Sequence, residues 1–487
     1  MRRDIAPPKK GLPASPLMSR EFTRLSAVEL ARLIRAKKAS PFEVAQAHLA
    51  AIEKLNPEVN AFCTVAAEKA LGWARDAETA VMKRGRLGPL HGVPIGIKDL
   101  TPTAGIRTTW GSSLFAEHVP TADAEVVLRL KAAGAIVLGK TNTPEFGAGA
   151  NTVNKLFGAT RNPWNTALSA SGSTGGGAAA LAARMVPLAE GTDFGGSLRT
   201  PAAFCGVVGL RTTAGLVAKH PATLPWHDQS VAGPMARSAE DCALLLDAMT
   251  GLSPKSPLSC AAPWRSALER VAGARHLKKL RFAYASDIAG IGVDDEIERL
   301  CRAAARDLAS AGAAIDEIEI SMGDGRDAFL ALRGEAMLGN HLERVERIGE
   351  LGDNLAGNIR AGLALKATEL ARAEHKRAEI WHRWRGLFEK YDLVLTPAAP
   401  VPPFPVEKNY PDVIYGRKLQ HYIDWIAPTF LVSLAALPAV SVPAGLTSAK
   451  LPVGLQIVGP RFSEPLILTA AKFVEAAHPI GLPPNCG

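Results

Sequence analysis

The sequence predicts an α/β fold in which helices flank a central, largely buried β-sheet. Short apolar runs that look like strands alternate with segments of helical periodicity along most of the chain. The 487 residues are 47% hydrophobic and 21% charged, which is close to the composition of globular enzymes and sufficient for a large core. No apolar run approaches the roughly 20 residues that a membrane helix needs.

The N-terminal part predicts a flexible tail followed by a layer of helices. We expect residues 1–22, which include several basic residues and prolines, to form the tail, and residues 23–487 to form a single domain. The two arginines near the start are not followed by the apolar region of an export signal, which favours a cytoplasmic protein. Ser40-Pro41-Phe42-Glu43 combines an N-cap, a proline at N1 and a glutamate at N3, so we expect a helix from there to about Leu55.

The remaining chain supplies the sheet and its covering helices. We expect further helices at Ala124–Ala133, Ala239–Met249 and Asp295–Ala311. Neither a flexible linker nor a repeat of 20–50 residues interrupts the pattern. Nine short runs predict strands: Val93–Ile97, Ala135–Leu138, Val186–Ala189, Val207–Leu210, Leu280–Tyr284, Ile315–Ile320, Leu393–Leu395, Val440–Val442 and Gly454–Val458.

The composition also argues against several classes of function. The six cysteines are dispersed without a Cys-x-x-Cys pair, and the eleven histidines form no His-x-x-x-His motif, so we expect no metal site and no metal-dependent hydrolase. The net charge is +9, but four basic residues lie in the first ten positions and most others alternate with acidic residues. We therefore interpret the charge as solvated surface and do not expect a nucleic-acid partner.

Two glycine-rich turns, each rich in hydroxyls, dominate Ser169–Thr200. Such turns can bind phosphate, but neither has the spacing of a P-loop or of a dinucleotide-binding motif. Tight helix packing would explain the glycines and alanines but not the polar side chains among them. A third interpretation is an activated serine with an oxyanion hole formed by the N–H groups of Phe194, Gly195, Gly196 and Ser197. The turns read Ser171-Gly172-Ser173-Thr174-Gly175-Gly176-Gly177 and Gly191-Thr192-Asp193-Phe194-Gly195-Gly196-Ser197-Leu198-Arg199.

A serine nucleophile needs a base, and Lys98 is the best candidate in the sequence. His91 and His220, the nearest histidines along the chain, carry no supporting motif. Lys98 follows an apolar run, Gly92-Val93-Pro94-Ile95-Gly96-Ile97, that we expect to be a buried strand. Burial would lower the pKa of the lysine and supply a neutral amine.

These motifs together resemble the amidase signature family over roughly residues 25–478. The resemblance implies the fold of that family, a large central mixed β-sheet flanked by helices, and hydrolysis of a carboxylic amide. Its motifs are Ile97-Lys98-Asp99, Gly139-Lys140-Thr141-Asn142, Gly158-Ala159-Thr160-Arg161-Asn162-Pro163-Trp164, the two turns above, Gly206-Val207-Val208-Gly209-Leu210 and Leu451-Pro452-Val453-Gly454-Leu455-Gln456.

The resemblance also implies a role for each residue of the turns. Lys98 corresponds to the catalytic base and Ser197 to the nucleophile. Ser173, preceded by a cis peptide bond from Gly172, corresponds to the proton relay and is expected to reach both of them. Thr174 and Thr192 correspond to hydroxyls that support the relay, and Asp193 and Arg199 to a structural ion pair. No cofactor or metal is implied, and no histidine is expected near Ser197.

The sequence departs from the family pattern at three positions. Family members usually read Gly-Gly-Ser-Ser-Gly-Gly in the first turn, where this chain has Ser171 and Thr174 in place of a glycine and a serine. Phe194 stands where threonine or isoleucine is frequent, and its ring is expected to reshape the acyl pocket. We expect Trp110, Phe146, Trp226 and the segment around Met337–His341 to line that pocket.

Two functional alternatives remain open at this point. A free-standing amidase acting on a small-molecule amide is favoured, in part because Tyr422-Ile423-Asp424-Trp425-Ile426-Ala427 resembles such enzymes. The main alternative is the amide-hydrolysing subunit of a tRNA-dependent amidotransferase complex, which shares every motif. A non-catalytic binding protein is disfavoured by the complete set of lysine and two serines. The sequence identifies neither the substrate nor the assembly state, monomer or homodimer.

Overall fold

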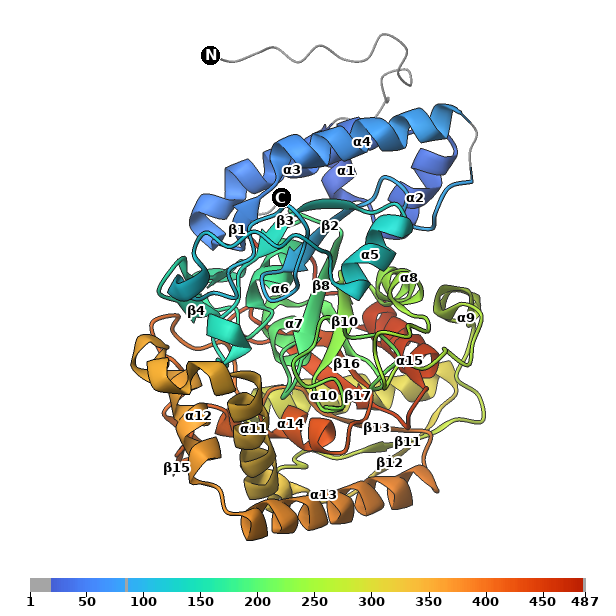
Figure 1. Ribbon diagram of the computed structural model, residues 1–487. Helices are drawn as coiled ribbons and strands as arrows, with labels where there is room; N and C mark the ends of the chain where they lie inside the picture. Colours follow the sequence, from blue (N-terminus) through green and yellow to red (C-terminus); the bar gives the residue numbers. More distant parts are fainter. Residues whose placement is uncertain (1–18, 84–85, 485–487) are drawn as a thin grey trace.

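A computed structural model describes residues 19–83 and 86–484, and its centre is one mixed sheet of eleven strands (Figure 1). The parallel pairs are β3 with β2, β2 with β8, β13 with β11 and β11 with β12, and the other neighbours are antiparallel. The strands in spatial order are β1 (Phe62–Val65), β3 (Ile136–Thr141), β2 (Pro94–Lys98), β8 (Leu188–Asp193), β10 (Val231–Ala236), β9 (Val208–Arg211), β16 (Ala439–Leu446), β17 (Pro452–Val458), β13 (Leu393–Pro397), β11 (Arg281–Tyr284) and β12 (Ala314–Glu317).

The sheet contains all nine strands that the sequence predicts, and two more. The additional strands are β1, at one edge, and β10, between β8 and β9. Three short hairpins lie outside the sheet: β4 (Val153–Asn154) with β5 (Gly158–Ala159), β6 (Arg161–Asn162) with β7 (Asn165–Ser169), and β14 (Val413–Ile414) with β15 (Arg417–Lys418). The predicted mixed sheet flanked by helices is therefore confirmed.

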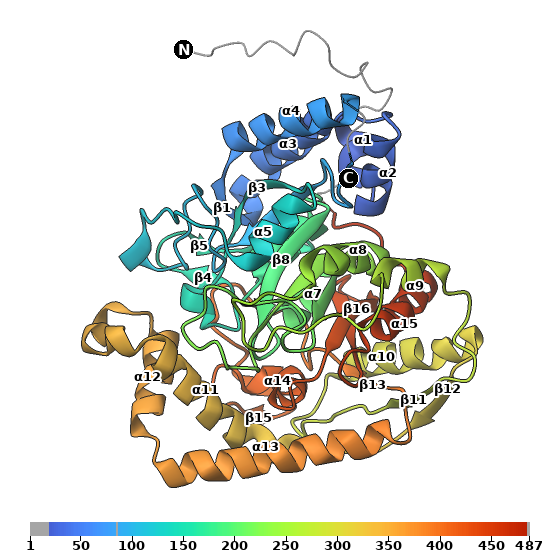
Figure 2. The ribbon, with the colours of Figure 1, turned by 45° about the vertical axis from the view of Figure 1, so that its right-hand side comes forward.

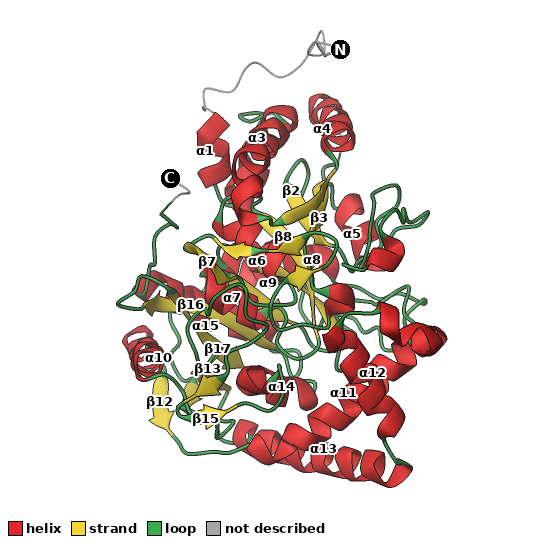
Figure 3. Ribbon diagram, turned by 90° about the vertical axis from the view of Figure 1, so that its left-hand side faces the viewer, coloured by secondary structure: helices red, strands yellow, loops and turns green. Residues whose placement is uncertain are grey.

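Helices cover the sheet and extend beyond it at two opposite ends (Figures 2 and 3). The first four helices form the predicted N-terminal layer at one end, and α11–α13 form a second layer at the other. The helices are α1 (Ser19–Arg24), α2 (Ala27–Arg35), α3 (Pro41–Val59), α4 (Ala67–Met82), α5 (Glu125–Ala132), α6 (Gly175–Ala182), α7 (Arg199–Cys205), α8 (Ala239–Met249), α9 (Ala267–Gly273), α10 (Asp295–Asp307), α11 (Arg326–Asn340), α12 (Asp353–Ala364), α13 (Ala367–Phe388), α14 (Ala427–Leu434) and α15 (Glu464–Ala477).

The N-terminal layer starts earlier than predicted, but the start of α3 is capped as predicted. Helix α1 begins at Ser19, inside the predicted tail, while residues 1–18 lie outside the described residues. The Ser40 hydroxyl accepts hydrogen bonds from the amides of Phe42 and Glu43 and so caps α3. The single domain over residues 23–487 stays a prediction. No helix within residues 19–83 and 86–484 is both long and apolar enough to cross a membrane.

Two short helices, α6 and α7, lie against the sheet and position the site. Every residue of each is buried. Helix α6 contains three glycines and four alanines among its eight residues, so its backbone approaches the strands closely. A Cβ on Gly176 would come within 2.4 Å of the Asn142 amide nitrogen, so only glycine fits there. This close packing brings the loops that precede both helices to the strand ends.

Candidate functional site

The site forms at the edge of the sheet where β2 and β8 end. The two strands are parallel neighbours, so Lys98 at the end of β2 and Asp193 at the end of β8 reach the same edge. Ser173 lies just before α6 and Ser197 just before α7, and the Thr174 amide donates to the Ser197 carbonyl at 3.2 Å. The crevice beyond the carboxyl ends of parallel strands is the usual place for a ligand site in α/β folds.

Lys98 is fully buried and surrounded by hydroxyls. Its Nζ lies 2.7 Å from Ser173 Oγ, 2.8 Å from Thr174 Oγ1 and 3.0 Å from Thr192 Oγ1. The predicted supporting threonines therefore contact the predicted base directly. Hydroxyls can accept from a protonated amine or donate to a neutral one, so this shell accommodates both states of Lys98.

Burial lowers the pKa of Lys98 to about 7, although Glu190 and Asp193 oppose the shift. Removal from water disfavours the charged form, and no carboxylate of the described residues forms a hydrogen bond or ion pair with the amine. This shift favours the neutral amine near neutral pH. A neutral amine 2.7 Å from a hydroxyl oxygen is suited to take a proton from it.

Ser173 and Ser197 border one cavity of about 390 Å³. The Gly172–Ser173 peptide bond is cis, as predicted. The expected hydrogen bond between Ser173 Oγ and Ser197 Oγ is not formed among the described residues. Catalytic hydrogen bonds are often long before substrate binds, so the relay between the two serines stays a prediction.

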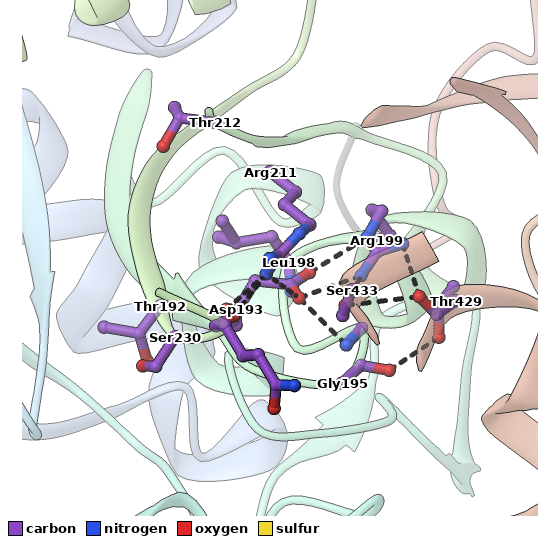
Figure 4. Close-up of polar contacts among 12 residues, drawn as sticks. Thr192, Asp193, Gly195, Leu198, Arg199, Arg211, Thr212, Ser230, Thr429 and Ser433 are labelled. Atoms are coloured by element: carbon purple, nitrogen blue, oxygen red, sulfur yellow. Dashed lines mark hydrogen bonds and ion pairs between the residues drawn. The ribbon is translucent and has the colours of Figure 1, made fainter. Parts of the chain in front are cut away.

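A buried ionic network holds the second turn in place (Figure 4). Arg199 makes a bidentate ion pair with Asp193, at 3.0 Å from Nε and 2.9 Å from Nη2. Arg211 donates to both the carbonyl and the carboxylate of Asp193. Burial alone would raise the pKa of Asp193, but these two guanidinium groups hold it well below its usual range. The predicted ion pair is thus present, and Arg211 is a third member that the sequence did not indicate.

The same network changes the predicted set of oxyanion donors. The Asp193 carboxylate accepts the amides of Gly196, at 2.9 Å, and Leu198, at 3.1 Å. The Gly196 amide therefore already donates to a carboxylate. The prediction that it belongs to the oxyanion hole is wrong for this reason. In the described structure the amides of Phe194, Gly195 and Ser197 have no such partner. Gly196 has φ +133°, and a Cβ there would meet Thr429 Oγ1 at 2.1 Å, so the turn requires glycine.

Aromatic rings form one wall of the cavity. Trp110 and Phe146, both predicted to line the pocket, do so with Phe115, and the rings of Trp110 and Phe146 stack at 6.3 Å. Met337 and His341 from the predicted segment also line it. The prediction for Trp226 is wrong, because its side chain is 72% exposed and lies outside the cavity lining. Its loop enters the cavity instead through Leu224 and His227.

For His227, the expectation that no histidine lies near Ser197 stays a prediction. His227 lines the same cavity, and its ring packs edge-on against Phe194 with 5.0 Å between centroids. Burial lowers the pKa of His227 to about 4, so the ring is neutral at pH 7. It makes no hydrogen bond to Ser197 in the described structure.

A second buried lysine lies behind the first. Lys140, near the end of β3, donates to the Thr101 carbonyl and, at 2.9 Å, to Thr103 Oγ1. Burial lowers its pKa to about 8. Glu190 accepts the Lys98 amide at 3.2 Å, and burial raises the pKa of this carboxyl. Lys140 ends an apolar run in a quoted family motif, so the signal that indicated Lys98 could have indicated its burial too.

Metal ligands do not gather at this site. Within residues 19–83 and 86–484, no three or more histidine, cysteine, aspartate or glutamate side chains form a group that could hold a metal ion.

Comparisons with known proteins agree with this arrangement. The family model named Amidase matches residues 43–468. An acylamidase of Rhodococcus erythropolis is 35% identical over 93% of this chain and 96% of its own. A glutamyl-tRNA(Gln) amidotransferase subunit from Methylococcus capsulatus is 36% identical over 93% and 97%.

Solved structures give the same result. A bacterial aryl acylamidase of the amidase signature family superimposes with a TM-score of 0.87 at 27% identity, over 93% of this chain and 96% of the other. A 6-aminohexanoate cyclic dimer hydrolase in complex with substrate gives 0.84 at 28% identity, over 96% and 100%. The chain belongs to the amidase signature family and is a carbon–nitrogen hydrolase that cleaves amides.

Proposed function

We propose that this amidase works through a Ser-cis-Ser-Lys triad in which Ser197 is the nucleophile, Ser173 the relay and Lys98 the base. The observation that carries the proposal is the contact of 2.7 Å between Ser173 Oγ and the buried Lys98 amine. Its lowered pKa supports a neutral amine at pH 7. Ser173 and Ser197 open onto the same cavity, which supports a relay from one to the other.

The steps follow from these roles. Ser197 Oγ attacks the amide carbon while its proton passes to Ser173, whose own proton passes to Lys98. The amides of Phe194, Gly195 and Ser197 stabilise the oxyanion. The protons return along the same path to the leaving nitrogen, and the C–N bond breaks to leave an ester on Ser197. Water then releases the carboxylic acid.

The test is labelling with a fluorophosphonate, which reacts with activated serines. We expect one covalent adduct, on Ser197, and no adduct in a Ser197→Ala variant that keeps the circular dichroism of the wild type. Ser433 is the control serine, which should stay unlabelled because its hydroxyl is buried and hydrogen-bonded to Thr429 and Arg199. Labelling elsewhere, with Ser197 unmodified, would falsify the assignment.

We further propose that the enzyme is free-standing, acts on a small-molecule amide and needs no nucleic-acid partner. The acylamidase and aryl acylamidase relatives support this, whereas the amidotransferase subunits, which are equally similar in sequence, favour a complex. The purified chain should hydrolyse simple amides without ATP, tRNA or a partner protein. Activity that requires those components would establish the alternative. A cytoplasmic location belongs to the same proposal.

A further inference from the structure

The cavity at Ser197 is lined by cations and by no acid. Lys219, Arg333 and Arg344 all border it, together with the neutral rings of His227 and His341. None of its described lining residues is an aspartate or a glutamate. A cleft lined by charges of one sign concentrates ligands of the opposite sign.

Arg333 is the most deeply buried of the three cations. It lies on α11, and its side chain is held by neutral groups: Nε donates to Asn358 Oδ1 at 3.0 Å, and Nη2 donates to Tyr422 Oη at 2.8 Å. The residue is only 5% exposed. Its guanidinium carbon lies 5.3 Å from the centre of the Phe194 ring, in the turn that carries Ser197.

No carboxylate of the described chain pairs with this guanidinium. Asp424, two residues from Tyr422, is instead paired with Arg326 at 2.8 Å. Nη1 of Arg333 makes no hydrogen bond among the described residues. A buried charge without a counter-charge is costly, and a bound ligand of opposite charge would offset that cost.

The other two cations, Arg344 and Lys219, also lack a paired carboxylate among the described residues. Arg344 lies over the rings of Phe115 and Phe146, at 5.4 and 5.3 Å, and Lys219 donates to the Ser230 carbonyl at 3.1 Å. Neither forms an ion pair in the described structure. Asp228, the acid nearest to Lys219 in sequence, is paired with Arg377 at 2.6 Å.

We propose that the substrate is an amide that also carries a carboxylate, and that Arg333 binds this carboxylate. The inference rests on the proposed function, because it concerns the same cavity. A guanidinium presents parallel N–H groups that match the two oxygens of a carboxylate. Arg333 is then a specificity-determining residue, while Lys219 and Arg344 draw the anion into the cavity. The aromatic wall accommodates the carbon chain or ring that separates the two groups.

A different explanation of the positive lining is that it stabilises only the oxyanion on the substrate. The two explanations differ in what they predict. Stabilisation of the oxyanion accelerates every amide equally, whether or not it bears a second charge. Recognition of a carboxylate favours the charged amide over a neutral one of the same shape.

The experiment compares dicarboxylic acid monoamides with the matching diamides. The probes are succinamate, glutaramate, adipamate and 4-carbamoylbenzoate, each beside its diamide, in which a neutral amide replaces the carboxylate. We expect wild-type enzyme to prefer at least one monoamide by about tenfold or more in kcat/KM per amide group, as charge-assisted hydrogen bonds imply. In Arg333→Gln this ratio should fall to about one, and in Arg333→Lys it should be intermediate. The ratio is insensitive to general loss of active enzyme.

Arg347→Gln is the matched control. Arg347 lies three residues from Arg344, but it is exposed, paired with Glu350 at 2.7 Å and outside the cavity lining. Its removal lowers the net charge equally and should leave the ratio as in the wild type.

The outcomes separate this inference from the proposed function. Equal hydrolysis of monoamides and diamides by the wild type overturns the carboxylate site and leaves the amidase mechanism intact. If no probe is hydrolysed, calorimetric binding to Ser197→Ala decides. Tighter binding of a monoamide than of its diamide, lost on adding Arg333→Gln, supports the site, and equal or absent binding overturns it.

Discussion

The proposed role of Lys98 as a buried base predicts that the rate depends on pH in a definite direction. With a pKa of about 7, the amine is mostly protonated below pH 7 and mostly neutral above it. Only the neutral form accepts a proton, so kcat/KM should rise with pH and level off above about pH 8. At pH 6 it should be about tenfold below the plateau. A profile measured from pH 5.5 to 9 that is flat, or that falls with pH, contradicts a lysine base.

Ser173 should be far more important than Thr174, although both hydroxyls contact Lys98. Only Ser173 also borders the cavity that Ser197 borders. Ser173→Ala removes the bridge and should lower kcat by about 10²–10⁴-fold. Thr174→Val keeps the bridge and the shape, and should cost less than about tenfold. Single-turnover rates, with circular dichroism as the check on folding, distinguish them. If Ser173→Ala lowered the rate as little as Thr174→Val does, the result would argue for a dyad in which Lys98 contacts Ser197 directly.

Single residues were predictable where a motif fixed their position. Lys98, Ser173, Thr174 and Thr192 lie together because the ends of two adjacent parallel strands and the start of α6 share one edge. Trp226 shows the limit: large aromatic residues are often buried, but the direction of a loop side chain depends on its neighbours, and this one faces solvent.

At the scale of elements, short runs of three to six residues predicted the strands well, except where composition opposed the environment. Strand β10 reads Val-Ala-Gly-Pro-Met-Ala, and glycine and proline are depleted in strands. It nevertheless pairs with β8 along its full length, so tertiary pairing overrides local preference. The packing of α6 and α7 likewise depends on close approach that a sequence pattern only suggests.

The ion pair of Arg199 with Asp193 should be essential to the turn between β8 and α7. Both side chains are fully buried. Arg199→Met leaves the Asp193 carboxylate without its bidentate partner, and the free energy of unfolding should fall by about 3–5 kcal/mol. The measurement is chemical denaturation at pH 7. Arg385→Met is the control, because its pair with Glu389 is more than half exposed and should contribute less than about 1 kcal/mol. Similar losses in both variants would contradict a structural role specific to Asp193.

At the scale of the whole molecule, the cavity combines segments that are far apart in the sequence. Ser173 and Ser197 come from the sheet edge, whereas Arg333 and Arg344 come from α11 and the turn after it, more than 130 residues later. The family motifs mark the first group and are silent on the second. The proposed catalytic residues were therefore predictable from sequence, whereas the position of Arg333 and Arg344 in the cavity required the fold.

The stability of the whole molecule should report the pKa of Lys98 without any substrate. The folded pKa of about 7 lies below the value of about 10.5 for an exposed lysine, so between these pH values the unfolded chain binds one more proton at this residue. The stabilisation linked to Lys98 is complete above pH 10.5 and is lost as pH falls toward 7. The free energy of unfolding of the wild type should therefore rise relative to that of Lys98→Met by about 1.4 kcal/mol per pH unit between pH 7.5 and 9.5.

Urea denaturation of both proteins at pH 7.5, 8.5 and 9.5 measures this difference. Other buried lysines, such as Lys140 and Lys219, titrate in both proteins and cancel in the comparison. Lys69→Met, at a more exposed lysine, is the matched control for replacing a lysine with methionine. A difference for Lys98→Met that is independent of pH would mean that the buried amine stays protonated. The proposed base would then be unavailable at neutral pH, whatever its distance from Ser173.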